Sequence, residues 1–217
     1  MQGIVRGWWI ALLSVMWLSG LALAASGTPT EFVRRTTDSL LQVFEEPKLQ
    51  GAAYREERLR RLRHIATTTF DWQEIARRAL ATHWRERTPQ ERQEFAELFR
   101  EAMQEMYLER METAAQKGLQ EKQAILYNGE QVDGQRAVVR TTVVTRHHRE
   151  IPIEYHLREA DGQWRTYDIV ILGVSLVNNY RAQFHRIITQ SSYQELIGQL
   201  QARQLREVFA EPPHMSR

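Results

Sequence analysis

Cysteine is absent from the 217-residue sequence. Disulfides, thiol catalysis and cysteine–zinc sites are therefore excluded, and the fold must be stabilised by its hydrophobic core alone. A large excess of charge of one sign is also absent, since 29 basic residues stand against 27 acidic ones and the formal net charge is +2. A nearly neutral chain lacks the basic footprint that is typical of nucleic-acid-binding proteins. We therefore expect no nucleic-acid partner.

Long hydrophobic runs are scarce as well. A single uncharged apolar stretch, residues 7–25, approaches the length that spans a bilayer. It follows the positive charge of Arg6, and the small residues at 22–24 suit signal peptidase. This pattern predicts a cleaved secretory signal peptide over residues 1–24. An uncleaved membrane anchor is the alternative, and the Thr-Pro pair at 28–29 favours cleavage, so we expect a soluble mature protein outside the cytoplasm.

Helical periodicity dominates the first half of the remaining chain. Apolar residues recur at helical spacing over residues 32–44 and again over 59–70. A capping box at Asp71 predicts a short helix to about residue 83. A stronger start signal, in which a hydroxyl cap is followed by proline and then by an acid, predicts a long helix over residues 89–117.

The apolar period changes from helical to two after residue 121. This change predicts four strands, at residues 122–131, 135–146, 150–159 and 163–172. Asp-Gly pairs fall where tight hairpin turns are needed, and the connections are too short for crossovers, so the strands form an antiparallel meander. Two helices follow, one from about Ser175 to Thr189 and one that opens at a capping box from Ser192 to Glu195.

The predicted fold class is therefore α+β. It has a helical N-terminal part, a four-stranded antiparallel meander and two C-terminal helices that enclose an apolar pocket. We expect a single domain over residues 25–210 and a disordered tail at 211–217.

The predicted fourth strand has two apolar faces. Strict alternation places one set of residues on one face, Arg165, Tyr167, Ile169 and Ile171, and another on the opposite face, Trp164, Thr166, Asp168, Val170 and Leu172. Such a strand is either covered by helices on both sides or borders an apolar cavity. The methionines of the long helix suit a cavity because flexible thioethers line adaptable apolar sites, although methionine at helical spacing more often belongs to a filled core.

Two blocks of sequence resemble a known family. They read IARRAL at 75–80 with WR at 84–85 and TPQER at 88–92, and then WRTYDIV at 164–170 with GVSLV at 173–177 and NYR at 179–181. On these motifs the chain, over roughly residues 30–204, resembles the MlaC or toluene-tolerance protein family of periplasmic phospholipid-binding proteins. Two positions depart from the family pattern, namely Ala81, where glycine is usual, and Leu172, where an acid often stands.

The resemblance implies a function. Members of this family carry a diacyl phospholipid between the inner and outer membranes of the periplasm, with the acyl chains buried between sheet and helices. The implied partners are an inner-membrane ABC transporter complex and an outer-membrane lipoprotein complex. We accordingly expect a periplasmic monomer without cofactor, metal or enzymatic activity, with phospholipid as cargo. A hopanoid or another hydrophobic ligand is an alternative cargo, because one branch of the family is associated with hopanoids.

The candidate lipid-binding residues are apolar or aromatic and lie on the long helix, the sheet and the helix after it. They are Phe99, Met103, Met106, Tyr107, Val143, Ile153, Tyr155, Leu157, Ile169, Ile171, Tyr180 and Phe184.

Catalytic readings of the sequence are weaker. Ser175 lies between a strand and a helix, but Val177 stands where a nucleophile elbow needs a small residue, so Ser175 is predicted to be a helix N-cap. Asp168 is predicted to form a structural pair with an arginine such as Arg181. The histidines lack the spacing of metal ligands, and the adjacent His147 and His148 would point to opposite sides of an extended chain. An enzyme acting on a hydrophobic substrate and an adaptor with a filled core stay open as alternatives.

Overall fold

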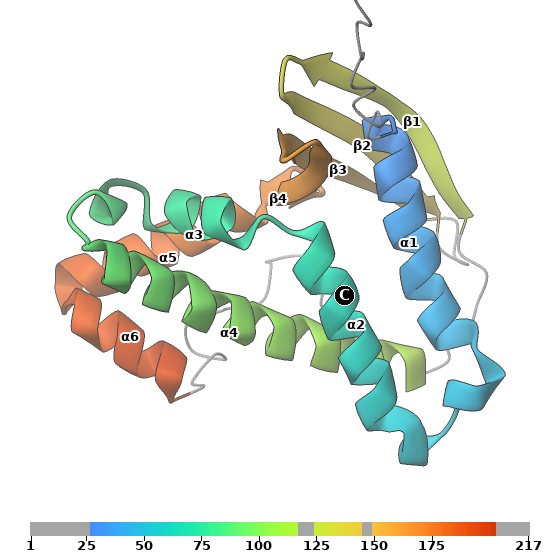
Figure 1. Cartoon of the computed structure of the whole chain (residues 1–217), viewed down its shortest axis with the longest axis horizontal. Coiled ribbons are helices and arrows are strands. Elements are labelled where there is room, and N and C mark those ends of the chain that lie inside the picture. The colour runs from blue at the N-terminus through green and yellow to red at the C-terminus, as the bar shows by residue number, and fades with distance from the viewer. Residues whose placement is uncertain (1–26, 117–123, 145–148, 203–217) are drawn as a thin grey trace, which may run out of the picture.

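The computed structural model describes residues 27–116, 124–144 and 149–202 (Figure 1). The predicted signal peptide, the tail at 211–217 and the histidine pair at 147–148 lie outside the described residues. Among the residues that are described, no helix combines the length and the apolar character needed to cross a bilayer.

The described chain forms helices, then a sheet, then helices, which confirms the α+β class. The α-helices are α1 Pro29–Glu45, α2 Arg55–Thr69, α3 Trp72–Leu80, α4 Pro89–Gln116, α5 Leu176–Gln190 and α6 Tyr193–Gln201. The strands are β1 Ala124–Asp133, β2 Arg136–Val144, β3 Glu150–Ala160, β4 Gln163–Ile171 and β5 Val174–Ser175. Short 3₁₀ turns occur at Pro47–Leu49, Ala52–Tyr54 and Ala81–Trp84.

The predicted helix starts are confirmed, because each cap side chain accepts a hydrogen bond from the backbone N–H three residues later. These caps are Asp71, Thr88, Ser175 and Ser192. Two of the predicted capping boxes are only half formed. The carboxylate of Glu74 accepts hydrogen bonds from Arg77 and Arg78 instead of the cap backbone, and that of Glu195 accepts one from Gln199.

The short helix α3 ends earlier than predicted, at Leu80 rather than near His83. Ala81 has a φ of 50°, a region that favours glycine, so the helix stops there and a 3₁₀ turn follows. The departure of Ala81 from the family pattern therefore falls on a position where the backbone itself favours glycine.

The sheet has five antiparallel strands in the order β1-β2-β3-β4-β5, so the prediction of four strands was wrong by one. The additional strand, β5, contains two residues and pairs with the end of β4 through a tight turn at Leu172 and Gly173. Both turn residues have positive φ, at 51° and 80°. A two-residue strand shows no sequence periodicity, and for this reason the pattern could not reveal it.

A β-bulge interrupts the pairing of β3 with β4. Leu157 is opposite Thr166 and His156 is opposite Asp168, so Tyr167 is an extra residue on β4 with no counterpart on β3. A bulge of this kind shifts the alternation of side chains by one position along the bulged strand.

The strict alternation predicted for this strand is therefore wrong. Thr166 lies on the same side of the sheet as Ile169, where both border one cavity. Val170 lies on the opposite side, where it borders another cavity together with Asp168. The bulge, rather than uninterrupted alternation, therefore decides which side chains of β4 face which cavity.

Helices cover the sheet unequally (Figure 1). α1 lies along the sheet and packs against β1 and β2, while α4 runs through the helical part between α3, α6 and α2. The main core joins α3, α4, α5 and α6 around the fully buried rings of Phe95, Phe99 and Phe184. A second cluster joins Val33 of α1 to β2, β3 and β4.

A buried ion pair connects α2, the second helix of the α1–α2 hairpin, to α4. The guanidinium of Arg58 on α2 donates to the carboxylate of Glu112 on α4 and to the carbonyl oxygens of Leu49 and Gly51. Because each buried charge is hydrogen-bonded, the pair fixes how α2 crosses α4. Asp71 similarly ties α3 to the sheet, since its N–H donates to the carbonyl of Thr166 at 2.9 Å.

Candidate functional site

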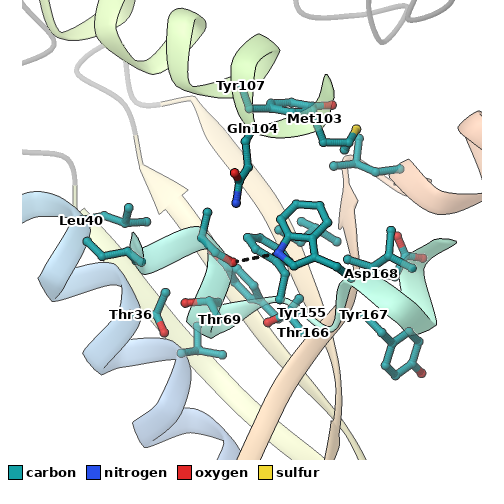
Figure 2. Close-up of a pocket in the computed structure, with 18 of the residues that line it drawn as sticks. Thr36, Leu40, Thr69, Met103, Gln104, Tyr107, Tyr155, Thr166, Tyr167 and Asp168 are labelled. Atoms are coloured by element: carbon teal, nitrogen blue, oxygen red, sulfur yellow. Dashed lines mark hydrogen bonds between the residues drawn. The ribbon is translucent and has the colours of Figure 1, made fainter. Parts of the chain in front are cut away.

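An apolar cavity of about 280 Å³ lies between the helices and one face of the sheet (Figure 2). Its helical walls come from α1, α2 and α4. Thr36 and Leu40 line it from α1, Ala66 from α2, and Met103 and Tyr107 from α4. These helices reach the same space because the α1–α2 hairpin crosses α4 beside the sheet (Figure 1).

The opposite wall comes from the sheet and from the start of α5. Tyr155 of β3 and Ile169 and Ile171 of β4 line the cavity from the sheet. Leu176 and Tyr180 close it from α5. Segments separated by more than a hundred residues of sequence therefore build one apolar interior.

The lining carries almost no charge. Among the described residues that border the cavity there is no lysine or arginine, and Asp168 is the one acid. The polar group of Gln104 is used outside the cavity, since its amide donates to Thr67 at 3.0 Å and its oxygen accepts from Arg100 at 2.7 Å. Thr37 likewise donates to the carbonyl of Val33 at 2.9 Å. Because these groups are already satisfied, the surface they leave to a ligand is apolar.

Tyrosines also contribute polar groups to the lining. The hydroxyls of Tyr107 and Tyr180 lie 3.2 Å apart and form a hydrogen bond between α4 and α5. Burial raises the pKa of Tyr180 far above its ordinary value, and burial also raises the pKa of Tyr107 and of Tyr155. All three side chains are therefore neutral at physiological pH.

Asp168 does not pair with Arg181, so that prediction was wrong. The carboxylate of Asp168 accepts from the Ser175 hydroxyl at 2.5 Å and from the Val177 N–H at 3.1 Å, while Arg181 donates to the side-chain oxygen of Asn178. The acid is held at the N-terminus of α5, where the helix dipole stabilises negative charge. The predicted N-cap role of Ser175 is confirmed, because its hydroxyl oxygen accepts from the Asn178 N–H at 3.0 Å.

Half of the twelve candidate lipid-binding residues line the cavity. They are Met103, Tyr107, Tyr155, Ile169, Ile171 and Tyr180. The other six lie elsewhere. Phe99 and Phe184 fill the main core at a ring separation of 5.0 Å, and Leu157 is fully buried in the cluster that includes Val33. Met106 packs against the main core, and Val143 and Ile153 are half-buried on the sheet outside the lining. Lipid contact by any of the twelve stays a prediction.

Sequence reasoning missed the contribution of α1 and α2. Phe32, Thr36 and Leu40 follow the apolar stripe of the first helix, and Ile65 and Ala66 follow that of the second. The stripes were visible as helical periodicity, but periodicity says only that a face is buried. It does not distinguish a face that packs against a core from one that borders a cavity.

Neither the cavity nor the rest of the described chain presents an assembled metal site. No group of three histidine, aspartate or glutamate side chains with suitable geometry occurs among the described residues. The rings of His83 and His185 approach each other to 3.0 Å, but they form a pair and not a ligand set.

Comparison with known proteins places this geometry in context. The model of the MlaC protein family matches residues 34–202. The toluene tolerance protein ttg2D of Pseudomonas putida is 24% identical over 165 residues, which cover 76% of this chain and 74% of that protein.

A solved structure shares the fold. It is the phospholipid-binding protein of Ralstonia solanacearum in complex with a phospholipid, with a TM-score of 0.67 and 20% identity over 84% of this chain and 99% of that chain. At this identity the likeness establishes a common fold. The family match spans most of the chain, from residue 34 within α1 to beyond the end of α6, and establishes kinship.

Proposed function

Because the chain belongs to the MlaC protein family, we propose that it is a periplasmic phospholipid-binding protein that carries its lipid between the inner and outer membranes. The observation that carries the proposal is the apolar cavity between the sheet and helices α1, α2 and α4. Its predominantly apolar lining matches the chemistry of acyl chains, and the relative with the shared fold was solved with a phospholipid bound.

The energetics of lipid transfer explain why a carrier is needed. A phospholipid holds about 30 tail methylenes, and exposing each to water costs about 0.8 kcal/mol, so free diffusion faces a penalty of about 24 kcal/mol. A carrier need only match the bilayer in affinity, because loading and unloading must both be possible. Apolar burial with few polar contacts achieves this match and tolerates several headgroups.

The size of the cavity indicates how the lipid is accommodated. A volume of about 280 Å³ lies at the small end of ligand sites, so two acyl chains require the lining side chains to move apart. Met103 and Met111 are unbranched and change rotamer readily. The lining from α1 consists of Phe32, Val33, Thr36, Thr37 and Leu40, and none of the hydrogen bonds described for these residues crosses the cavity. We propose that the α1–α2 hairpin and α4 separate slightly when lipid enters.

Membership of the family and the match to a toluene tolerance protein support the wider setting. We propose that the chain exchanges lipid with an inner-membrane ABC transporter complex and an outer-membrane lipoprotein complex, and that it has no catalytic role. The hydrogen bonds of Ser175 with Asp168 and Asn178 support the second point, since they engage the hydroxyl in capping α5. A polycyclic lipid is the alternative cargo.

Native mass spectrometry of the protein purified from periplasm under mild conditions tests the proposal. We expect the wild-type protein to carry one phospholipid. Thr36→Phe places a ring into the cavity from α1 and should lower the fraction of protein that carries lipid at least about tenfold. The free energy of unfolding should not fall, because filling a cavity adds contacts. Ser39→Phe is the matched control on the same helix, outside the lining, and should retain the lipid.

The possible outcomes are distinct. A bare mass for the wild-type protein under every mild condition would overturn the proposal. Lipid retained equally by both phenylalanine variants would place the lipid somewhere other than this cavity. Release of lysophospholipid or fatty acid by the pure protein would favour an enzyme.

A further inference from the structure

A second cavity, of about 700 Å³, lies on the opposite side of β4 from the apolar one. It is bordered by α3, the 3₁₀ turn after it, β4, and the start of α5. Arg77, Arg78 and Arg85 reach it from the first of the two family motif blocks, and Asp168 and Arg181 from the second. The two blocks, about eighty residues apart, therefore converge on this cavity, and the lipid-binding proposal uses few of these residues.

Two of the four arginines are already engaged by an acid. Glu74, which is 8% exposed, accepts from Arg77 and from Arg78 at 2.7 Å each. Burial opposes ionisation of Glu74, but the hydrogen bonds from the two guanidinium groups outweigh it and lower its pKa. Arg78 also stacks over the ring of Tyr167, with its guanidinium carbon 4.0 Å from the ring centre.

The other two arginines have no acid. Among the described residues, no carboxylate lies within ion-pair distance of Arg85 or Arg181. Arg181 bonds only the neutral side chain of Asn178, and Asp168 spends both carboxylate oxygens on Ser175 and Val177. The cavity therefore presents two exposed guanidinium groups that lack a counter-charge.

The apolar part of the wall matters equally. Trp84 and Val170 border the cavity, and Leu172, which is 45% exposed, stands beside it in the turn before Gly173. Arginine, tryptophan and tyrosine are the residue types that dominate the energetics of protein–protein interfaces. A space of 700 Å³ is larger than one phosphate or carboxylate fills, and it suits a chain segment that brings an acid and an apolar side chain together.

The wall between the cavities argues against a lipid headgroup as the occupant. Tyr167, Asp168 and Val177 border both spaces, and the hydrogen bonds of Asp168 close the wall. These shared residues stand between lipid tails in the apolar cavity and the arginines of the second one.

We propose that this cavity is a docking site for an acidic segment of a partner protein, whose carboxylates pair with Arg85 and Arg181 while an apolar side chain rests against Trp84. The inference deepens the proposed function, on which it rests, by naming the surface at which a membrane-bound partner is recognised. Bidentate pairing with arginine gives such a contact its strength and geometry.

The test uses the mature protein and a short synthetic peptide that contains glutamate and leucine. A matched peptide with glutamine in place of every glutamate is the ligand control. Binding is measured by fluorescence anisotropy, and NMR signals of the Arg85 and Arg181 Nε–H groups and of the Trp84 indole report the location. We expect the acidic peptide to shift these signals and the glutamine peptide to bind at least about tenfold more weakly.

Charge reversal separates this cavity from general electrostatics. Arg85→Glu combined with Arg181→Glu should weaken peptide binding at least about tenfold, whereas Arg63→Glu combined with Arg186→Glu makes the same charge change at exposed sites outside the cavity and should change it less than about twofold. If the double glutamate variant does not fold, the milder double variant Arg85→Gln with Arg181→Gln replaces it in the same measurement. Phospholipid content by native mass spectrometry should be unchanged in all of them.

Three other outcomes would contradict the docking proposal, and a fourth would separate it from the carrier function. Equal loss of binding in both double variants would show nonspecific attraction. Shifts produced by inorganic phosphate or by anionic phospholipid vesicles, but not by the peptide, would assign the cavity to phosphate or to a membrane surface. Loss of lipid from the Arg85 and Arg181 variants with peptide binding intact would assign it to the headgroup. A wild-type protein without lipid that still binds the peptide would overturn the carrier function and leave the docking site standing.

Discussion

Two cavities lie on either side of β4, and they differ in chemistry. The apolar one has no lysine or arginine among its described lining residues, whereas the polar one gathers four arginines. Neighbouring residues of one strand serve both, since Ile169 borders the first and Val170 the second. The contrast shows that one strand can separate an apolar cavity from a charged one, because successive side chains point to opposite faces of the sheet and the bulge at Tyr167 sets which residues point to which face.

The largest expected effect comes from placing the same acid on each side of this strand. Ile169→Glu buries a carboxylate in the apolar cavity and should lower the free energy of unfolding by about 3 kcal/mol and abolish lipid retention. Val170→Glu places the carboxylate on the other side of the strand, opposite Glu154 of β3 and in the cavity that Arg85 and Arg181 border, and should lower stability by no more than about 1 kcal/mol. Urea denaturation and native mass spectrometry measure both. Equal destabilisation by the two variants would refute the contrast between the cavities.

A smaller effect is expected at Glu74, which organises the polar side. Glu74→Gln leaves Arg77 and Arg78 without their acid and should cost about 1–2 kcal/mol at pH 7. Because the pKa of Glu74 is lowered in the folded state, its contribution is present at neutral pH and is lost as pH falls below about 4.5 through the folded pKa. The wild-type stability curve should therefore fall more steeply with acid than that of the variant.

Glu97 provides the control for that measurement. It pairs with Arg100 on α4 and is 58% exposed, so Glu97→Gln should cost less than about 0.5 kcal/mol at neutral pH. If the two glutamine variants lose the same stability, the buried ion pairs of Glu74 contribute no more to the free energy of unfolding than an exposed pair does. Glu74 then does not hold Arg77 and Arg78 in place at the polar cavity.

An effect smaller than that at Glu74 is expected within the apolar cavity, at the hydrogen bond between Tyr107 and Tyr180. Tyr107→Phe removes the hydrogen bond to Tyr180 and should cost about 1 kcal/mol while lipid retention stays intact. A double-mutant cycle with Tyr180→Phe isolates the interaction. Loss of lipid in Tyr107→Phe would indicate that this polar group holds the ligand and that the cavity is not purely an acyl-chain site.

Local chemistry explains which parts of the fold were predictable. The caps at Thr88 and Ser192 and the change of apolar period near residue 122 depend on neighbours in sequence, and each was confirmed to within a few residues. The two-residue strand β5 and the early end of α3 at Ala81 depend on backbone conformations that side-chain pattern does not encode, and both were missed.

The candidate site divides along the same line. Met103 and Tyr107 were predicted because they continue a stripe on one helix, and they line the cavity. Phe99 follows the same stripe one turn earlier, yet it is fully buried in the main core. Residues one helical turn apart on α4 therefore differ in role, because one lines the cavity and the other fills the core. Only the positions of α5 and the sheet decide which role each has.

The amino-acid sequence by itself determined the α+β order of elements, the helix starts and the family, because these rest on local hydrogen bonding, periodicity and motif. Tertiary structure alone decided that α1 and α2 face a hollow, that Tyr167 is bulged, and that Asp168 caps α5 rather than pairing with Arg181. The physical reason is that an apolar face must be buried and a buried charge must be paired, and both needs can be read from sequence. Which segment buries the face or pairs the charge depends on the packing of residues that are distant in the sequence.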